Sequence, residues 1–178
     1  MIEPIRWLLL IYKVPSEPAR QRAAVWRRLK SLGAVYLQDG AAVLPESRGA
    51  ERALRSLRNE IDGFGGTGYL MRCETIAGEG AVIAAYNQAR DDEYDEIVDR
   101  CRDFEAEIQT ETAAEHLTYA ELEENDEDLA KLRNWLAKVR ARDVLSADGA
   151  AAAAEAVERC EAALEGFAAL VYEAEGAR

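Results

Sequence analysis

The stretch Trp7-Leu8-Leu9-Leu10-Ile11-Tyr12-Lys13-Val14-Pro15 opens the part of the chain that decides the fold. It is a nearly unbroken apolar run that is too short for a capped helix. Runs of this kind are typical of a strand at the centre of a sheet. Proline has no amide hydrogen for a sheet ladder, so Pro15 ends the predicted strand.

Two helix patterns and two further extended runs follow within the first 76 residues. The helices are predicted from apolar residues at spacings of three and four. Ser16 is a candidate N-cap for the first of them, and Gly33 is a candidate for the residue that ends it. In chain order, the sequence predicts a helix over 20–32, an extended run over 34–45, a helix over 49–61 and an extended run over 68–76.

The dipeptide Asp39-Gly40 leaves two alternatives for the second extended run. Asp-Gly between apolar residues is a strong signal for a hairpin. A bulge at Gly40 inside one bent strand fits the same residues. We favour a hairpin-like kink inside one extended element, which gives the element order β-α-β-α-β over residues 1–76.

The remaining residues show a helical period throughout. A long helix is expected over 82–115, bent near Asp91-Asp92. Helices over 126–142 and 148–174 are expected to form an antiparallel hairpin, with Asn125 or Asp126 as the N-cap of the first. The chain therefore divides into a sheet-containing domain, 1–80, and a helical extension packed on it, 81–178.

Charge is distributed unevenly along the chain. The net charge is −12, but residues 1–62 carry a net of +4 and residues 63–178 a net of −16. An acidic total argues against adhesion of the whole surface to nucleic acid or to an anionic membrane, yet it leaves room for one basic face in the N-terminal part.

The localisation expected from the sequence is cytoplasmic. No apolar run approaches the roughly 18 residues of a membrane helix, and the first residues lack the layout of a signal peptide. The cysteines Cys73, Cys101 and Cys160 are odd in number and far apart, so we expect buried thiols rather than disulfides or a metal site.

Several strings of residues resemble the ChrB family, the regulators associated with bacterial chromate resistance, in their N-terminal domain. The resemblance extends over nearly the whole chain and implies a regulatory protein that responds to chromate or oxidative stress. The strings that carry it most clearly are Trp7–Pro15, Trp26–Lys30, Leu32–Ala34, Tyr36–Gly40, Phe104–Glu111, Thr118–Asn125, Trp135-Leu136 and Arg140–Asp143.

Residues 6–76 also resemble, more weakly, the central domain of PaaX-type repressors and the small CRISPR-associated nucleases. This resemblance implies a ferredoxin-like α+β core, followed here by the long helix and the helical hairpin. The nucleases hold a metal with an aspartate at the end of their first strand, where this chain has Tyr12-Lys13-Val14. The alternative interpretation is therefore a divergent, inactive nuclease-like domain.

Basic residues recur on the sides of the first two predicted helices that face away from their apolar residues. They are candidates for contacts with DNA phosphates. A small oxyanion such as chromate is an alternative ligand, and it would bind on the side that carries Arg28 and Arg55. A solvated face, or a face that pairs with acidic helices of the same or another copy, is the competing interpretation. The candidate residues are Arg20, Arg22, Arg27, Arg28, Lys30, Arg52, Arg55 and Arg58.

No catalytic constellation is present in the sequence, and no metal or cofactor site is expected. The acidic stretch Glu121–Asp128 lacks the glycine and the ligand spacing of a calcium loop, and His116 has no nucleophile to activate. The glycine-rich stretch Gly63–Gly68 follows a helix instead of preceding one, the reverse of a phosphate-binding loop. We therefore expect a non-enzymatic regulatory or interaction protein that forms homo-oligomers, with a small-oxyanion binder as the alternative.

Overall fold

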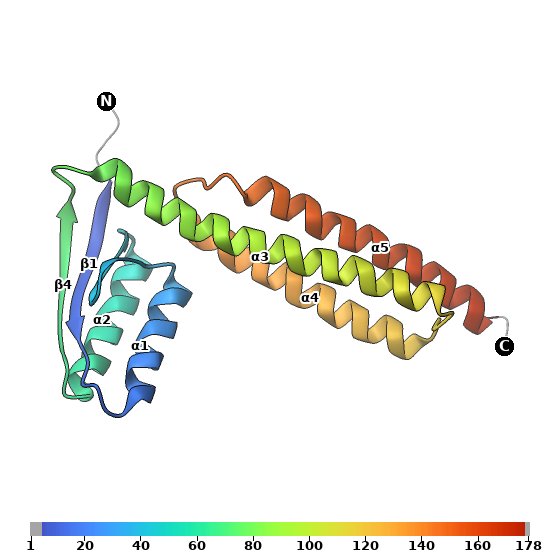
Figure 1. Ribbon diagram of the computed structural model, residues 1–178, viewed down its shortest axis with the longest axis horizontal. Helices are drawn as coiled ribbons and strands as arrows, with labels where there is room; N and C mark the ends of the chain where they lie inside the picture. The colour runs from blue at the N-terminus through green and yellow to red at the C-terminus, as the bar shows by residue number, and fades with distance from the viewer. Residues whose placement is uncertain (1–4, 177–178) are drawn as a thin grey trace. The chain divides into compact units, whose positions relative to one another are not determined.

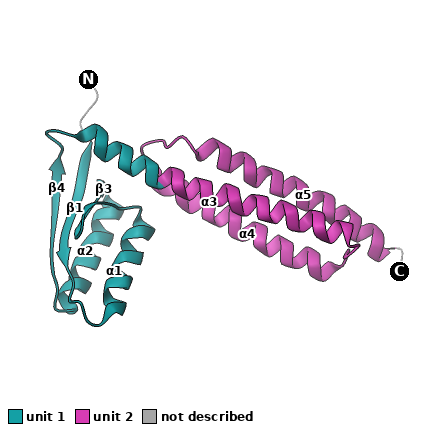
Figure 2. Cartoon of the chain, viewed as in Figure 1, with its two compact units in different colours: residues 1–89 teal, residues 90–178 magenta. Residues whose placement is uncertain are grey.

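The computed structural model describes residues 5–176 (Figure 1). Residues 1–4, the start of the predicted sheet domain, lie outside the described residues. The chain divides into two compact units, Met1–Ala89 and Arg90–Arg178 (Figure 2). The elements are β1 (Arg6–Lys13), α1 (Ala19–Leu32), β2 (Val35–Gln38), β3 (Ala41–Pro45), α2 (Arg48–Gly63), β4 (Thr67–Glu74), α3 (Glu79–Ala113), α4 (Tyr119–Arg142) and α5 (Ala150–Gly176).

The first unit is built on a four-stranded antiparallel sheet with the strand order β2-β3-β1-β4. The strand β1 is central, as its continuous apolar run predicts, and it pairs with β3 on one side and with β4 on the other. Leu9 lies opposite Val43 in one pairing and opposite Met71 in the other. The α+β class expected from the sequence is confirmed.

The stretch 34–45 is a hairpin of two strands, so the prediction of one kinked extended element is wrong and the alternative is right. The strands β2 and β3 pair with each other around Asp39-Gly40, with an irregularity between Tyr36 and Gln38. Gly40 has a φ of 74°, and a Cβ there would lie 2.5 Å from the carbonyl oxygen of Tyr12. The chain reverses at this position because glycine alone tolerates both conditions.

One face of the sheet is covered by α1 and α2, which lie on the same side of it (Figure 1). Leu8 and Leu10 of β1 are fully buried on that side. The helices contribute the other buried side chains of this core, which are Val25, Leu29, Leu54, Leu57 and Ile61. On the alternate face, the Trp7 ring packs edge-on against Tyr86 in the first turns of α3, with the centroids 6.2 Å apart.

The ends of the helices agree with the sequence in part. Gly33 ends α1 with a φ of 80°, as predicted, but Ser16 does not cap it. The cap position is Pro18, whose extended backbone starts the helix without a side-chain hydrogen bond. In α2 the Ser47 side chain accepts a hydrogen bond of 3.0 Å from the Ala50 amide, the usual N-cap contact.

The second unit is helical, and α4 and α5 pack against each other as the predicted hairpin. The helix α3 runs unbroken through Asp91-Asp92. The helix α4 begins seven residues before the predicted start, because Thr118 accepts the hydrogen bond from the Glu121 amide. The two predicted caps, Asn125 and Asp126, both lie inside α4. Asn125 is buried and donates to Glu111 and to the Glu121 carbonyl.

Buried side chains of all three helices form one cluster in the second unit, from Tyr94 on α3 to Val171 on α5. Cys101 and Cys160 lie in it as free thiols, and the Cys160 thiol lies 3.5 Å from the Cys101 carbonyl oxygen. Burial raises the pKa of both thiols, that of Cys160 to about 12. None of the described helices has the length and apolarity that crossing a membrane requires.

Candidate functional site

The cationic residues of α1 are exposed and largely without partners. None of the described residues forms an ion pair or hydrogen bond with the guanidinium groups of Arg20, Arg22 or Arg27. The Lys30 ammonium lies over the Trp26 ring, 5.3 Å from its centroid, and Trp26 is half exposed. This arrangement leaves a set of charges that is available to a ligand with negative charge.

Two of the four arginines of α2 form ion pairs within the helix. Arg55 contacts Glu51 at 2.8 Å, and Arg58 contacts Asp62 at 2.8 Å, each one turn away on the same helix. Arg52 is exposed and, among the described residues, has no ion-pair partner.

Arg28 stands apart from the other α1 cations. It reaches across to α2 and donates to Glu60 at 3.1 Å. The eight predicted residues therefore do not form one uniform basic face, because three of them are neutralised by neighbours and the others are not.

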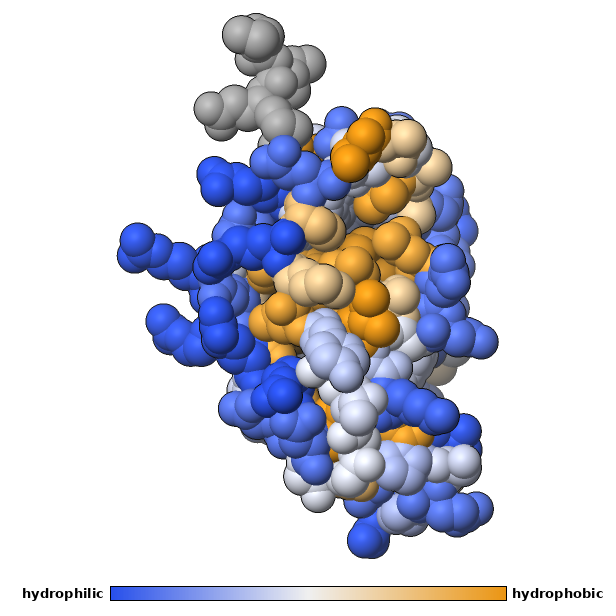
Figure 3. Space-filling view, turned by 90° about the vertical axis from the view of Figure 1, so that its left-hand side faces the viewer, coloured by the Kyte–Doolittle hydropathy of each residue, from blue (hydrophilic) through white to orange (hydrophobic). Residues whose placement is uncertain are grey.

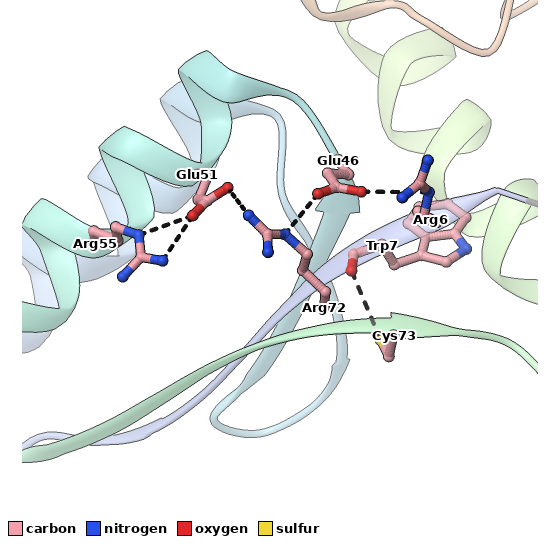
Figure 4. Close-up of polar contacts among 7 residues, drawn as sticks. All are labelled: Arg6, Trp7, Glu46, Glu51, Arg55, Arg72 and Cys73. Atoms are coloured by element: carbon pink, nitrogen blue, oxygen red, sulfur yellow. Dashed lines mark hydrogen bonds and ion pairs between the residues drawn. The ribbon is translucent and has the colours of Figure 1, made fainter.

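A ladder of alternating charges runs from α2 across to the sheet (Figure 4). Arg72 on β4 contacts Glu51 at 2.5 Å and Glu46 at 2.7 Å, and Glu46 also contacts Arg6 at 3.6 Å. The hydrogen bonds from Arg55 and then Arg72 lower the pKa of the Glu51 carboxyl. The hydrogen bond to Glu51 raises the pKa of Arg72, so this ladder remains charged at neutral pH.

A pocket of about 490 Å³ lies beside this ladder, between α2 and β4. Three guanidinium groups and one carboxylate contribute to its wall, and the Arg58 side chain also donates to the Gly68 carbonyl at 3.1 Å. Guanidinium groups bind oxyanions through paired N–H donors. All three here already pair with a carboxylate, so an anionic ligand would compete with Glu51 and Asp62 for these donors. It is lined by Leu8, Glu51, Arg55, Arg58, Asn59, Leu70, Met71 and Arg72.

Arg28 is not among the lining residues, so the structure separates Arg28 and Arg55, which the sequence grouped as one oxyanion side. Glu51, Asn59 and Arg72 are the polar lining residues that the sequence analysis missed. A signal for Arg72 was present, since it alternates with Gly68 and Leu70 on the helix-facing side of β4 and is the cationic residue of that series. Alternation of this kind marks one face of a strand.

No group of three metal-ligating side chains is found among the described residues. His116 lies in the short connection between α3 and α4. The acidic stretch 121–128 forms the first turns of α4, where Glu121 lies in the first turn. Negative charge near a helix N-terminus is favourable, which accounts for its position without a ligand.

Comparison with known proteins gives a family for the chain. The family described as "Protein ChrB, N-terminal" matches residues 22–178. Protein ChrB of Cupriavidus metallidurans is 27% identical over 118 residues, which is 66% of this chain and 33% of that protein. The matched part is thus about a third of the relative's length. No solved structure matches the chain. Since the family match extends over most of the sequence, the chain belongs to the ChrB N-terminal family.

Proposed function

We propose that the chain is a non-enzymatic regulatory protein of the ChrB type that binds DNA through the cationic outer face of α1. The observation that carries this proposal is the pair of exposed guanidinium groups of Arg20 and Arg27 on that face, which lack ion-pair partners among the described residues. Unpaired cations neutralise phosphates and release counterions, whereas cations already paired with carboxylates contribute little. The family resemblance supports a role in the response to chromate.

Helix geometry gives a common direction to three of the α1 cations but not to Arg22, which lies about 160° around the helix from Arg20 and close in direction to the buried Leu29. Successive residues of a helix are about 100° apart, so Arg20, Arg27 and Lys30 lie on the side opposite the buried Val25 and Leu29. One strip of this kind is about 15 Å long, since each residue advances a helix by about 1.5 Å. Its length suits contacts with a few consecutive phosphates.

The proposal includes a ferredoxin-like arrangement of the first unit and a homo-oligomer in the cytoplasm. The order β-α-β-β-α-β with two helices on one side of an antiparallel sheet supports the first point. This arrangement leaves α1 and α2 as the outer layer on their side of the sheet.

The test is a fluorescence anisotropy titration with duplex DNA from upstream of the chain's own operon, across a range of salt concentrations, with and without chromate. Replacing Arg20, Arg27 and Lys30 together with alanine removes three phosphate contacts. The slope of log affinity against log salt should fall by about 2.7, which is about 0.9 for each contact.

The matched control replaces Arg55 and Arg58, which already pair with carboxylates. This variant should change the slope by less than about 0.9, the change expected for one phosphate contact. An unchanged slope in the triple variant, with the chain folded by circular dichroism, removes α1 as the DNA-binding element. Absence of binding by the unaltered chain with and without chromate removes the DNA proposal altogether.

A second candidate function is the binding of a small oxyanion in the pocket between α2 and β4. The observation that favours it is the convergence there of Arg55, Arg58 and Arg72 with the Asn59 amide. Calorimetric titration with chromate, sulfate and phosphate should show binding that weakens with salt. Arg72→Gln should abolish it, and Arg27→Gln, on the outer side of α1, should leave it unchanged. A flat titration of the unaltered chain contradicts this candidate.

A further inference from the structure

The face of the sheet that is turned away from α1 and α2 carries exposed apolar side chains. Ile11 is 42% exposed, Tyr69 is 64% exposed and Met71 is 41% exposed. The strand pairing places Ile11 opposite Tyr69, and Leu9 opposite Met71. Figure 3 shows the apolar side chains gathered over this face of the sheet.

The centre of this face holds no charged residue. Leu9 lies between Val43 on β3 and Met71 on β4, and Trp7 lies opposite Cys73. Lys13, opposite Thr67, is a charged residue on the same face, but it lies at the end of β1 and not at the centre. An apolar surface of this kind, contiguous across strands and rimmed by polar residues, marks a contact with another molecule rather than with water.

The chemistry of the face selects its partner. Nucleic acid needs cations and stacking rings, and among the central positions only Tyr69 offers an exposed ring, because Trp7 is buried. A second copy of the same face is complementary to it, since two uncharged apolar sheets bring no like charges together. Twisted antiparallel sheets pack face to face in this way, about 10 Å apart.

We propose that this outer sheet face is a homodimer interface in which the sheets of two copies pack against each other about a two-fold axis. In such an isologous contact the same residues of both copies meet. The interface does not involve the outer side of α1, so the proposed DNA-binding residues remain accessible in the dimer. It shares Met71 with the lining of the pocket between α2 and β4, so dimerisation would cover part of that pocket.

The size of the face determines how strong the dimer is. The strands β1 and β4 have 8 residues each, β3 has 5 and β2 has 4. With a rise of about 3.3 Å per residue and a spacing of about 4.8 Å between strands, the face measures about 400 Å². Trp7, Val35 and Val43 on this face are already buried within the chain, so two copies bury less than about 800 Å². An area of this size is below the range of stable complexes and typical of a weak, reversible one. We therefore expect dissociation in the micromolar range.

Sedimentation velocity of the full chain, without DNA, tests the interface from about 1 to about 200 µM. The sedimentation coefficient should rise with concentration from that of one copy toward that of two. Met71→Glu and, separately, Tyr69→Lys should each weaken the association at least tenfold, because each places a charge in the apolar contact. Val144→Glu, at a residue of the second unit that is 59% exposed, makes a similar change away from the face and should leave the association unaltered.

Two outcomes overturn the proposal. In the first, the unaltered chain sediments as one copy at every concentration. In the second, both face variants associate as the unaltered chain does while remaining folded by circular dichroism. If the chain is a monomer, a separate anisotropy titration of Met71→Glu with DNA determines whether the face contacts nucleic acid instead. The interface rests on the homo-oligomer of the proposed function, and because sedimentation is measured without DNA or oxyanion, its failure leaves the tests of DNA and oxyanion binding unaffected.

Discussion

The two compact units of the chain distribute charge in opposite ways. Residues 1–89 carry 12 Lys/Arg against 9 Asp/Glu, a net of +3, whereas residues 90–178 carry 10 against 25, a net of −15. In the first unit, exposed cations without partners lie on α1. In the second, carboxylates cover the outer sides of helices whose inner sides fill one core.

The apolar surfaces of the two units differ as well. The second unit buries most of its apolar residues in a single cluster contributed by three helices, and Val144 and Tyr172 are among those it exposes. The first unit buries one face of its sheet under α1 and α2 and leaves Ile11, Tyr69 and Met71 exposed together on the other. Because these three side chains adjoin one another, we propose that the first unit carries the surface that contacts a partner.

The largest expected effect comes from the core of the second unit. Phe167 is 1% exposed at the centre of the cluster. Phe167→Ala should lower the free energy of unfolding by about 3–5 kcal/mol, because it removes a large buried ring and leaves a cavity. Urea unfolding followed by circular dichroism measures the loss.

The control for Phe167→Ala is Leu170→Ala, on the same helix at a residue that is 38% exposed. Its cost should stay below about 1 kcal/mol. Equal losses in the two variants would contradict the description of the second unit as a single packed core.

The sequence predicted the second unit well because its signal is local and periodic. Leu129, Leu132, Leu136 and Val139 recur with the period of a helix, and all four are buried on α4. The start of α4 was harder to predict, since Thr118 and Asn125 are both good cap residues. The choice between them depends on Glu111, which lies 14 residues before Asn125 in the sequence. Glu111 accepts a hydrogen bond from the Asn125 side chain and so holds that side chain inside the unit.

The first unit was predicted less completely because its geometry depends on contacts between distant residues. The Asp39-Gly40 signal for a hairpin was visible, but the close approach of Tyr12 to Gly40 that fixes the turn was not. A strand of four residues such as β2 is too short to show its own alternation.

The candidate site was also predicted incompletely, because its contacts join residues that are distant in the sequence. All the cationic residues on α1 and α2 except Arg48 were named as candidates from the sequence, but which of them are neutralised was not predicted. Arg28 pairs with Glu60, 32 residues away in the sequence, and Arg72 pairs with Glu51, 21 residues away. Helical spacing alone carries no information on partners this far apart.

A second prediction concerns the turn in the first unit. Gly40→Ala should destabilise the unit by at least about 2 kcal/mol, because alanine disfavours the positive φ and its Cβ would lie against the Tyr12 carbonyl. Gly65→Ala isolates the backbone effect, since Gly65 has a similar φ of 76° but no atom within 4 Å of the added Cβ. Its cost should be about 1 kcal/mol. Equal costs would show that the contact between the turn and β1 is not tight.

A third prediction uses the buried thiols of the second unit. Burial raises the pKa of Cys160 to about 12, above the ordinary value near 9. Between these values the unfolded thiol releases its proton and the folded thiol keeps it, so the unfolded state binds fewer protons and stability falls as pH rises. The slope is at most about 1.4 kcal/mol per pH unit for each thiol. Burial of Tyr94 also raises its pKa and adds to the loss.

The measurement is urea unfolding at several pH values from about 8 to about 11. Cys160→Ala removes one of the titrating groups, so its stability should fall less steeply with pH than that of the unaltered chain. Identical slopes for the two chains would mean that the Cys160 thiol is accessible to solvent in the folded state, in conflict with its burial.

The smallest expected effect is a gain in stability. Gly166 lies inside α5 on an exposed side, and a Cβ there would meet no atom within 4 Å. Gly166→Ala should raise the free energy of unfolding by about 0.5–1 kcal/mol, since alanine loses less backbone freedom in a helix. Gly40→Ala and Gly166→Ala thus make the same chemical change with opposite signs. The sign depends on whether the residue lies in a positive-φ turn against a neighbouring strand or on the open side of a helix. A loss of stability on Gly166→Ala would indicate that this side of α5 is closely covered in solution. That result would contradict the contrast between a helical unit that packs on itself and a sheet unit with an exposed apolar face.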